Sequence, residues 1–196
     1  MKMKLFAVML GGRTQGAHIE LHDLVFVVGN ALEDTYPNLV RKWFGNTHKS
    51  LHIDSSLELD IIDGYQVTLS STQPSDETNS KKLHCVNFGG YKEGFFGEIH
   101  EVSFIVSNSK KEVTKKAKNL LCVDTLQQHC DDNFVIGSDN FKKDVDDVIT
   151  VNHVDGYYIH LTPTENVSKQ KVKSQYIRLD VPNVLSQLNT ESEVVA

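Results

Sequence analysis

The fold is decided by a stretch of sequence that occurs twice: KLFAVMLGGRTQGAHIELHDLVFVVGN at residues 4–30 and KLHCVNFGGYKEGFFGEIHEVSFIVSN at residues 82–108. Lys4 aligns with Lys82, and this offset of 78 residues holds without a gap to the end of both stretches. The matches include a glycine pair and His22 with His100, and so are not confined to common apolar residues. We infer that the chain is an internal duplication.

A second anchor lies downstream, where Asp63-Gly64-Tyr65 matches Asp155-Gly156-Tyr157 at an offset of 92 residues. The second copy therefore carries 14 additional residues, the difference between the offsets of 92 and 78. The predicted organisation is a first unit at residues 4–70, a linker at 71–81, a second unit at 82–162 with the insertion near 123–141, and a polar segment, short strand and frayed tail at 163–196.

Each unit has the pattern of a β-β-α-β-β element. The first strand, residues 5–10, is apolar on both faces and so is expected in the centre of a covered sheet. The second, from about Ile19 to Val28, has one apolar face in both copies. Its other face is looser and is expected to meet solvent or a partner layer. A helix is predicted from Thr35 to Gly45.

In the second unit, Ser109 and Glu112 form a capping box at the start of the corresponding helix. The two Asp-Gly pairs predict tight hairpin turns. Another strand is expected at residues 176–181. The predicted fold is α+β, a tandem duplication with pseudo-twofold symmetry, in which helices pack against a mainly antiparallel sheet. We favour one domain over two lobes because each unit alone would have a small core.

Composition narrows the class of protein. A net charge of −6 and a pI near 5.8 argue against nucleic-acid binding. Three cysteines without a C-x-x-C pair indicate a reducing compartment. The short apolar run after Met1 recurs in mid-chain, where no signal peptide could act. We therefore expect a cytoplasmic protein with small-molecule or protein partners and no membrane contact.

Candidate chemistry lies in a Glu/His pair that occurs in both copies. Glu20 and His22 share one strand face, as do Glu98 and His100, at the rim of the core. His18 extends the first copy to H-x-E-x-H. The simpler alternative, which we favour, is that each Glu pairs with its His for structural reasons. The candidate ligands for zinc, iron or manganese are His18, Glu20, His22, His52 and Asp54.

The glycine-rich loop could hold an anion on its backbone N–H groups. A strand follows it, however, and not a helix, so a bulged or wide turn is favoured. The acidic run at residues 144–147 matches His52-Ile53-Asp54 loosely and could bind a hard cation, but it is interpreted as a solvated acidic edge. Cys85 is interpreted as a small buried residue. The ligand-binding candidates are Gly11, Gly12, Arg13, Glu20, His22, Glu98 and His100.

Residues 4–13, 19–23, 25–29, 32–37, 43–45, 52–54 and 63–65 together resemble a bacterial family of unknown function, number fifteen-forty-three in the domain-of-unknown-function series. Members carry one or two copies of a short domain. The second copy here departs from the pattern, since Tyr91 replaces Arg13 and the Tyr-Pro and His-x-Asp elements are missing. The resemblance implies a bacterial origin but no activity.

Two hypotheses remain open. We favour a non-enzymatic ligand- or protein-binding module, because no complete catalytic motif is present and the second copy has diverged. The alternative is a small metal-dependent or acid/base enzyme that uses Glu20 and His22, with His18, His52 and Asp54. The sequence requires no cofactor and indicates neither substrate nor oligomeric state.

Overall fold

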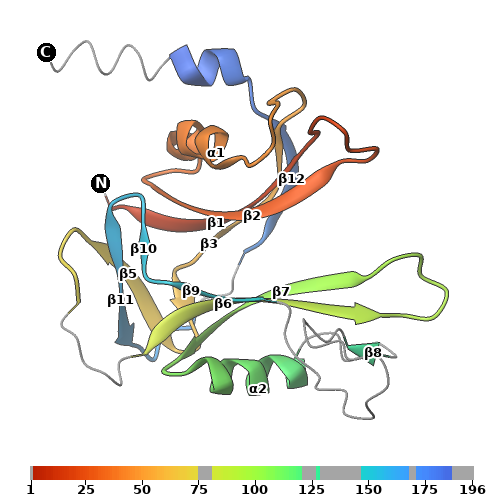
Figure 1. The fold of residues 1–196 in the computed structure, drawn as a ribbon. Helices are drawn as coiled ribbons and strands as arrows, with labels where there is room; N and C mark the ends of the chain where they lie inside the picture. Colours follow the sequence, from red (N-terminus) through yellow and green to blue (C-terminus); the bar gives the residue numbers. More distant parts are fainter. Residues whose placement is uncertain (1, 75–80, 121–126, 129–146, 168–170, 187–196) are drawn as a thin grey trace, which may run out of the picture.

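The computed structural model describes residues 2–74, 81–120, 127–128, 147–167 and 171–186 (Figure 1). Within these residues the protein consists of three mainly antiparallel sheets with a few short helices. This arrangement confirms the α+β class. None of the described helices is long and apolar enough to cross a membrane.

The first sheet has the order β12-β3-β1-β2, and all its neighbours are antiparallel. β1 lies inside the sheet and is covered on both faces, as predicted. Leu5 and Ala7 enter one buried cluster, whereas Val8 and Leu10 enter another with the helix α1. The strands are β1 (Lys4–Gly12), β2 (Leu21–Gly29), β3 (His52–Glu58) and β12 (Lys173–Arg178).

The helix α1 (Tyr36–Lys42), preceded by the short 3-10 turn η1 (Glu33–Thr35), covers the face of this sheet that carries the second cluster (Figure 1). Its start agrees with the prediction, but its predicted end at Gly45 is wrong. Trp43 adopts an extended backbone, and its buried ring packs over Gly12 and Gly45. Tertiary packing of the indole therefore ends the helix early.

β2 also differs from its prediction, because it begins at Leu21 and not at Ile19. Val25 and Val27, on the face predicted to be looser, are buried in the cluster that includes α1. The partner layer, and not solvent, covers that face. Leu24 and Phe26 on the opposite face pack against the first cluster.

The second unit builds a sheet around β6, with β7 on one side and β8 and β9 on the other. The registers repeat those of the first sheet: Leu83 pairs with Val106 as Leu5 pairs with Val28. The elements are β6 (Lys82–Tyr91), β7 (Ile99–Ser107), α2 (Lys110–Leu120), β8 (Gln127–Gln128) and β9 (Asp147–Val151).

The predicted capping box at the start of α2 is half formed. The Ser109 Oγ accepts the backbone N–H of Glu112 at 3.3 Å. The Glu112 carboxylate, however, accepts the hydroxyl of Ser107 at 2.6 Å and does not return to the Ser109 N–H. The first turn of α2 is thereby tied to the end of β7.

The third sheet joins the two units in the order β10-β11-β5-β4. Both Asp-Gly pairs form the predicted two-residue turns, with φ of 50° and 76° at Asp63 and Gly64 and of 49° and 84° at Asp155 and Gly156. These left-handed values suit the primed hairpin turns. The strands are β4 (Ile61–Ile62), β5 (Tyr65–Ser70), β10 (His153–Val154) and β11 (Tyr157–Pro163).

Each hairpin turn contacts the other unit in the same way. The Asp63 carboxylate accepts the Val106 N–H at 2.9 Å, and the Asp155 carboxylate accepts the Val28 N–H at 3.0 Å. Leu5, Val67, Leu83 and Ile159, from both units, share one buried cluster. The two units thus have a common core.

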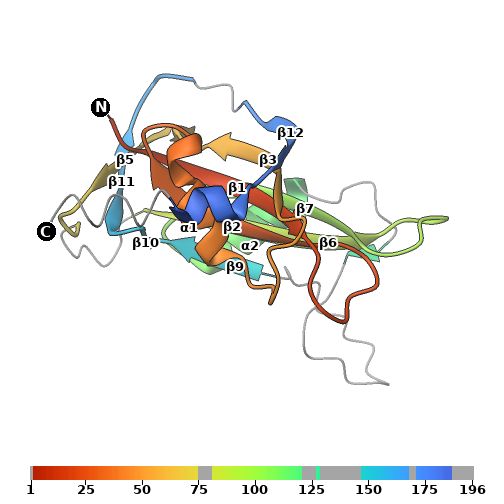
Figure 2. The same cartoon turned by 90° about the horizontal axis from the view of Figure 1, so that it is seen from above.

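The C-terminal segment returns to the first sheet. β12 pairs with β3, and Figure 2 shows the two strands side by side at the sheet edge. The strand predicted at residues 176–181 therefore begins and ends three residues earlier, and residues 181–186 are helical. The predicted insertion near 123–141 lies outside the described residues except for β8, and so do residues 144–146.

Candidate metal site

A row of residues crosses the first sheet on the face opposite α1. Gly11 of β1 is paired with His22 of β2 on one side and with His52 of β3 on the other. Arg178 of β12 is paired with His52 in turn. Residues directly opposite each other in antiparallel strands project from the same face. The two imidazoles therefore flank a position that has no side chain.

Gly11 leaves room for the groups that fill this position. A Cβ built on Gly11 would lie 2.5 Å from His52 Nε2 and 2.6 Å from Asp54 Oδ2. Both atoms thus sit directly over the glycine. Gly12 points to the opposite face, where its Cβ would lie 2.9 Å from the Trp43 ring. The two glycines are explained by close packing, and only Gly11 contributes to the cluster.

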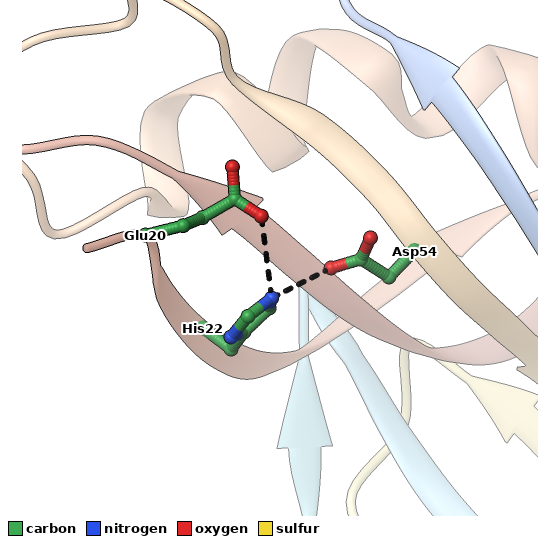
Figure 3. A group of neighbouring side chains, drawn as sticks. All are labelled: Glu20, His22 and Asp54. Atoms are coloured by element: carbon green, nitrogen blue, oxygen red, sulfur yellow. Dashed lines mark ion pairs between the residues drawn. The ribbon is translucent and has the colours of Figure 1, made fainter.

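Four side chains meet above Gly11. His22 Nε2 lies 3.2 Å from Asp54 Oδ2 and 3.5 Å from Glu20 Oε1. Figure 3 shows that the imidazole of His22 lies between the two carboxylates. His52 Nε2 lies 3.2 Å from Asp54 Oδ1 and 3.4 Å from Glu20 Oε1. Each carboxylate therefore contacts both imidazoles, and the four residues form one cluster, named here the Gly11 cluster.

The four His–carboxylate distances in the Gly11 cluster are close to those between neighbouring ligands of one ion. Charge-assisted N–H···O hydrogen bonds are shorter, about 2.7–2.9 Å. Ligand atoms about 2.1 Å from a tetrahedral ion lie about 3.4 Å apart. In addition, Asp54 Oδ2 is buried and, although it lies 3.2 Å from His22 Nε2, it accepts no hydrogen bond within the described part of the chain. The groups Glu20, His22 and Asp54 offer three ligand atoms that all lie within 4.8 Å of one another.

His52 is held in the orientation of a metal ligand. Its Nδ1 lies 2.7 Å from the carbonyl oxygen of Ser50. Because a carbonyl only accepts, the proton must be on Nδ1, which leaves Nε2 as the nitrogen that can offer a lone pair to an ion in the cluster. The ring is 1% exposed and lies against Tyr176 of β12, with centroids 4.3 Å apart. His22, by contrast, has a half-exposed side chain, which leaves the cluster open to solvent.

The other predicted residues lie elsewhere. Arg13 and His18 are exposed in the loop between β1 and β2 and are not part of the Gly11 cluster. Glu98 and His100 contact each other at 3.4 Å in the second unit. The residues that match His52 and Asp54 there, at 144 and 146, lie outside the described residues.

Sequence reasoning missed two contributors to the Gly11 cluster. The Ser50 carbonyl orients His52 through the backbone, which leaves no signal in residue type. Tyr176 comes from the C-terminal segment, and its place beside His52 depends on the pairing of β12 with β3. The contacts of Ser50 and Tyr176 with His52 both depend on the tertiary structure and cannot be identified from residue type.

The protein has an α+β architecture that also occurs in a solved crystal structure. The chain is similar to the crystal structure of protein Il1583 from Idiomarina loihiensis, at 30% identity and a TM-score of 0.64, over 90% of this chain and 98% of that one. No curated protein matches it. The family described as Domain of Unknown Function (DUF1543) matches residues 17–69, and the chain belongs to this family. The matched residues include all four members of the Gly11 cluster.

Proposed function

We propose that this protein binds a divalent transition-metal ion through Glu20, His22, His52 and Asp54. The observation that carries the proposal is that the carboxylate oxygens of Glu20 and Asp54 lie 3.2–3.5 Å from Nε2 of both His22 and His52, above Gly11. Two imidazoles and two carboxylates suit zinc, iron(II) or manganese(II). Calcium and magnesium prefer oxygen ligands alone.

We further propose that the chain is a tandem duplication with pseudo-twofold symmetry and that only its first unit binds metal. The equal strand registers and the reciprocal contacts of Asp63 and Asp155 support the duplication. In the described part of the second unit, Glu98 and His100 form the matching pair. The sequence has Asp144 and Asp146 where the first unit has His52 and Asp54, so an imidazole is lost.

The proposed role is a metal-dependent binding module of the cytoplasm, in which the ion takes a group of the bound partner as an additional ligand. The half-exposed His22 side chain supports access of such a group from solvent. The same access favours a second candidate, a metal-dependent enzyme that uses an ion-bound water. A search for hydrolysis of esters and phosphoesters by zinc- and manganese-loaded protein separates the two.

Metal analysis tests the proposal. Protein stripped with chelator and then dialysed against zinc or manganese is expected to hold one ion per chain. Calorimetric titration should show that His22→Gln and Asp54→Asn lower the affinity more than about a hundredfold, because even partners of ligands contribute about 10–100-fold.

The matched control is His100→Gln, which makes the same change at the equivalent position of the second unit and is expected to leave the affinity unchanged. Wild-type protein without stoichiometric metal, or a His22→Gln variant that binds as tightly as wild type, would show that the Gly11 cluster is a structural network. Circular dichroism of each variant establishes that it is folded.

A further inference from the structure

A pocket lies at the edge of the first sheet, between the segment that leads into β3 and the segment that follows β12. Its volume is about 670 Å³, and it is lined by His48, Lys49 and Ser50 on one side and by residues 178–182 on the other. Small-molecule sites commonly have about 300–1,000 Å³. The Leu179 N–H donates to the Leu51 carbonyl at 3.0 Å and joins the two sides. The pocket therefore lies where these two chain segments are hydrogen-bonded to each other.

The charged groups of the pocket are predominantly basic. Lys49 and Arg178 line it, and Asp180 is its one acidic residue. Within the described residues, the side chains of Lys49 and Arg178 make neither an ion pair nor a hydrogen bond. Two unpaired cations against one carboxylate give the pocket a local excess of positive charge in a chain with a net charge of −6.

Ser50, which lines the pocket, has an unusual local environment. Its hydroxyl oxygen is buried and has no hydrogen-bond partner among the described residues. Its backbone has a φ of 73°, in the left-handed region that a serine rarely adopts. Such strain persists only where the surroundings impose it, and it concentrates at functional sites.

The remaining wall is apolar. Leu179, Val181 and Pro182 line it beside the charged residues. An inorganic ion would leave this surface in water, whereas an organic molecule would cover it.

We infer that this pocket binds a small organic anion, whose carboxylate or phosphate is held by Lys49 and Arg178. Guanidinium and ammonium groups bind both kinds of oxyanion, and the arginine can do so with two parallel hydrogen bonds. The inference stands on the pocket alone and does not require a metal in the Gly11 cluster.

The test is a titration of the ¹⁵N-labelled full chain, stripped of metal, at constant ionic strength. The probes are inorganic phosphate, phenyl phosphate and succinate. Saturable shifts of the amide signals of residues 48–50 and 178–180 are expected, with the organic probes binding more tightly than inorganic phosphate. Tighter binding of phenyl phosphate or of succinate identifies the preferred oxyanion.

The double variant Lys49→Gln/Arg178→Gln should weaken binding of the best probe about tenfold or more, since hydrogen bonds to charged groups are removed. The charge-matched control Arg41→Gln/Lys173→Gln changes exposed residues outside the pocket and should bind as wild type. Absence of saturable shifts with all three probes, or equal weakening in the control, would overturn the inference.

Discussion

Replacing Gly11 by alanine should abolish metal binding while leaving the fold intact. The new Cβ would lie 2.5 Å from His52 Nε2 and 2.6 Å from Asp54 Oδ2, whereas ordinary contacts begin at 3.4 Å. The two ligand atoms must therefore move by roughly 0.9 Å, which is several times the about 0.2 Å that metal–ligand distances tolerate. His52 cannot move easily, because it is buried and its Nδ1 is bonded to the Ser50 carbonyl.

The expected cost in stability is moderate. Overpacking a filled site costs about 1–3 kcal/mol, and loss of glycine flexibility in the unfolded chain returns about 0.4–1 kcal/mol. We expect a net loss of about 1–2 kcal/mol in the free energy of unfolding, measured with urea in the presence of chelator.

Gly12→Ala is the matched control. Its Cβ would lie 2.9 Å from the buried Trp43 ring on the other face of the sheet. This variant should lose a similar amount of stability but should bind zinc with wild-type affinity in calorimetric titration. If Gly11→Ala binds zinc as tightly as wild type, the proposed ligands do not act above Gly11 and the reasoning fails.

Three further predictions concern contacts around the core and the cluster. Asp155→Asn should lower the free energy of unfolding by about 1.5–3 kcal/mol, because this largely buried carboxylate accepts the Val28 N–H and pairs with Lys42. Asp63→Asn changes a more exposed carboxylate and should lower the free energy of unfolding by less than about 1 kcal/mol. Equal losses of the two variants in urea unfolding would contradict this prediction. Tyr176→Ala should weaken zinc binding about two- to tenfold by removing the ring against His52, and calorimetry that shows no change would argue against such support. Burial lowers the pKa of His84 below its ordinary value of 6.5, so the unfolded chain takes up the proton first as the pH falls. The free energy of unfolding should therefore decline between about pH 7 and pH 5, and it should decline less in a His84→Gln variant.

Local pattern predicted much of the fold. The apolar strand at the start of each unit and the Asp-Gly turns are specified by residue type and spacing, so their positions agree with the structure. The end of α1 could not be predicted, because it depends on where the Trp43 ring packs. The pairing of β12 with β3 joins residues more than a hundred positions apart, and no sequence period encodes such a contact.

The Gly11 cluster was only partly predictable for the same reason. Glu20 with His22, and His52 with Asp54, were candidates because residues two apart share a strand face. Their convergence depends on β1, which lies between their strands and carries a glycine at the point where they meet. His18 had equal merit as a pattern, but the loop carries it away from the cluster.

The pairing of β5 with β11 means that neither half of this chain is complete. Cutting the molecule between the units would leave β5 as a bare edge, expose the Leu5 cluster to water and deprive the Val28 N–H of its acceptor. A fragment of residues 4–70 would recover these contacts only by associating with a second molecule, with β5 of each placed against the other. A relative that carries a single unit is therefore expected to exist as a homodimer.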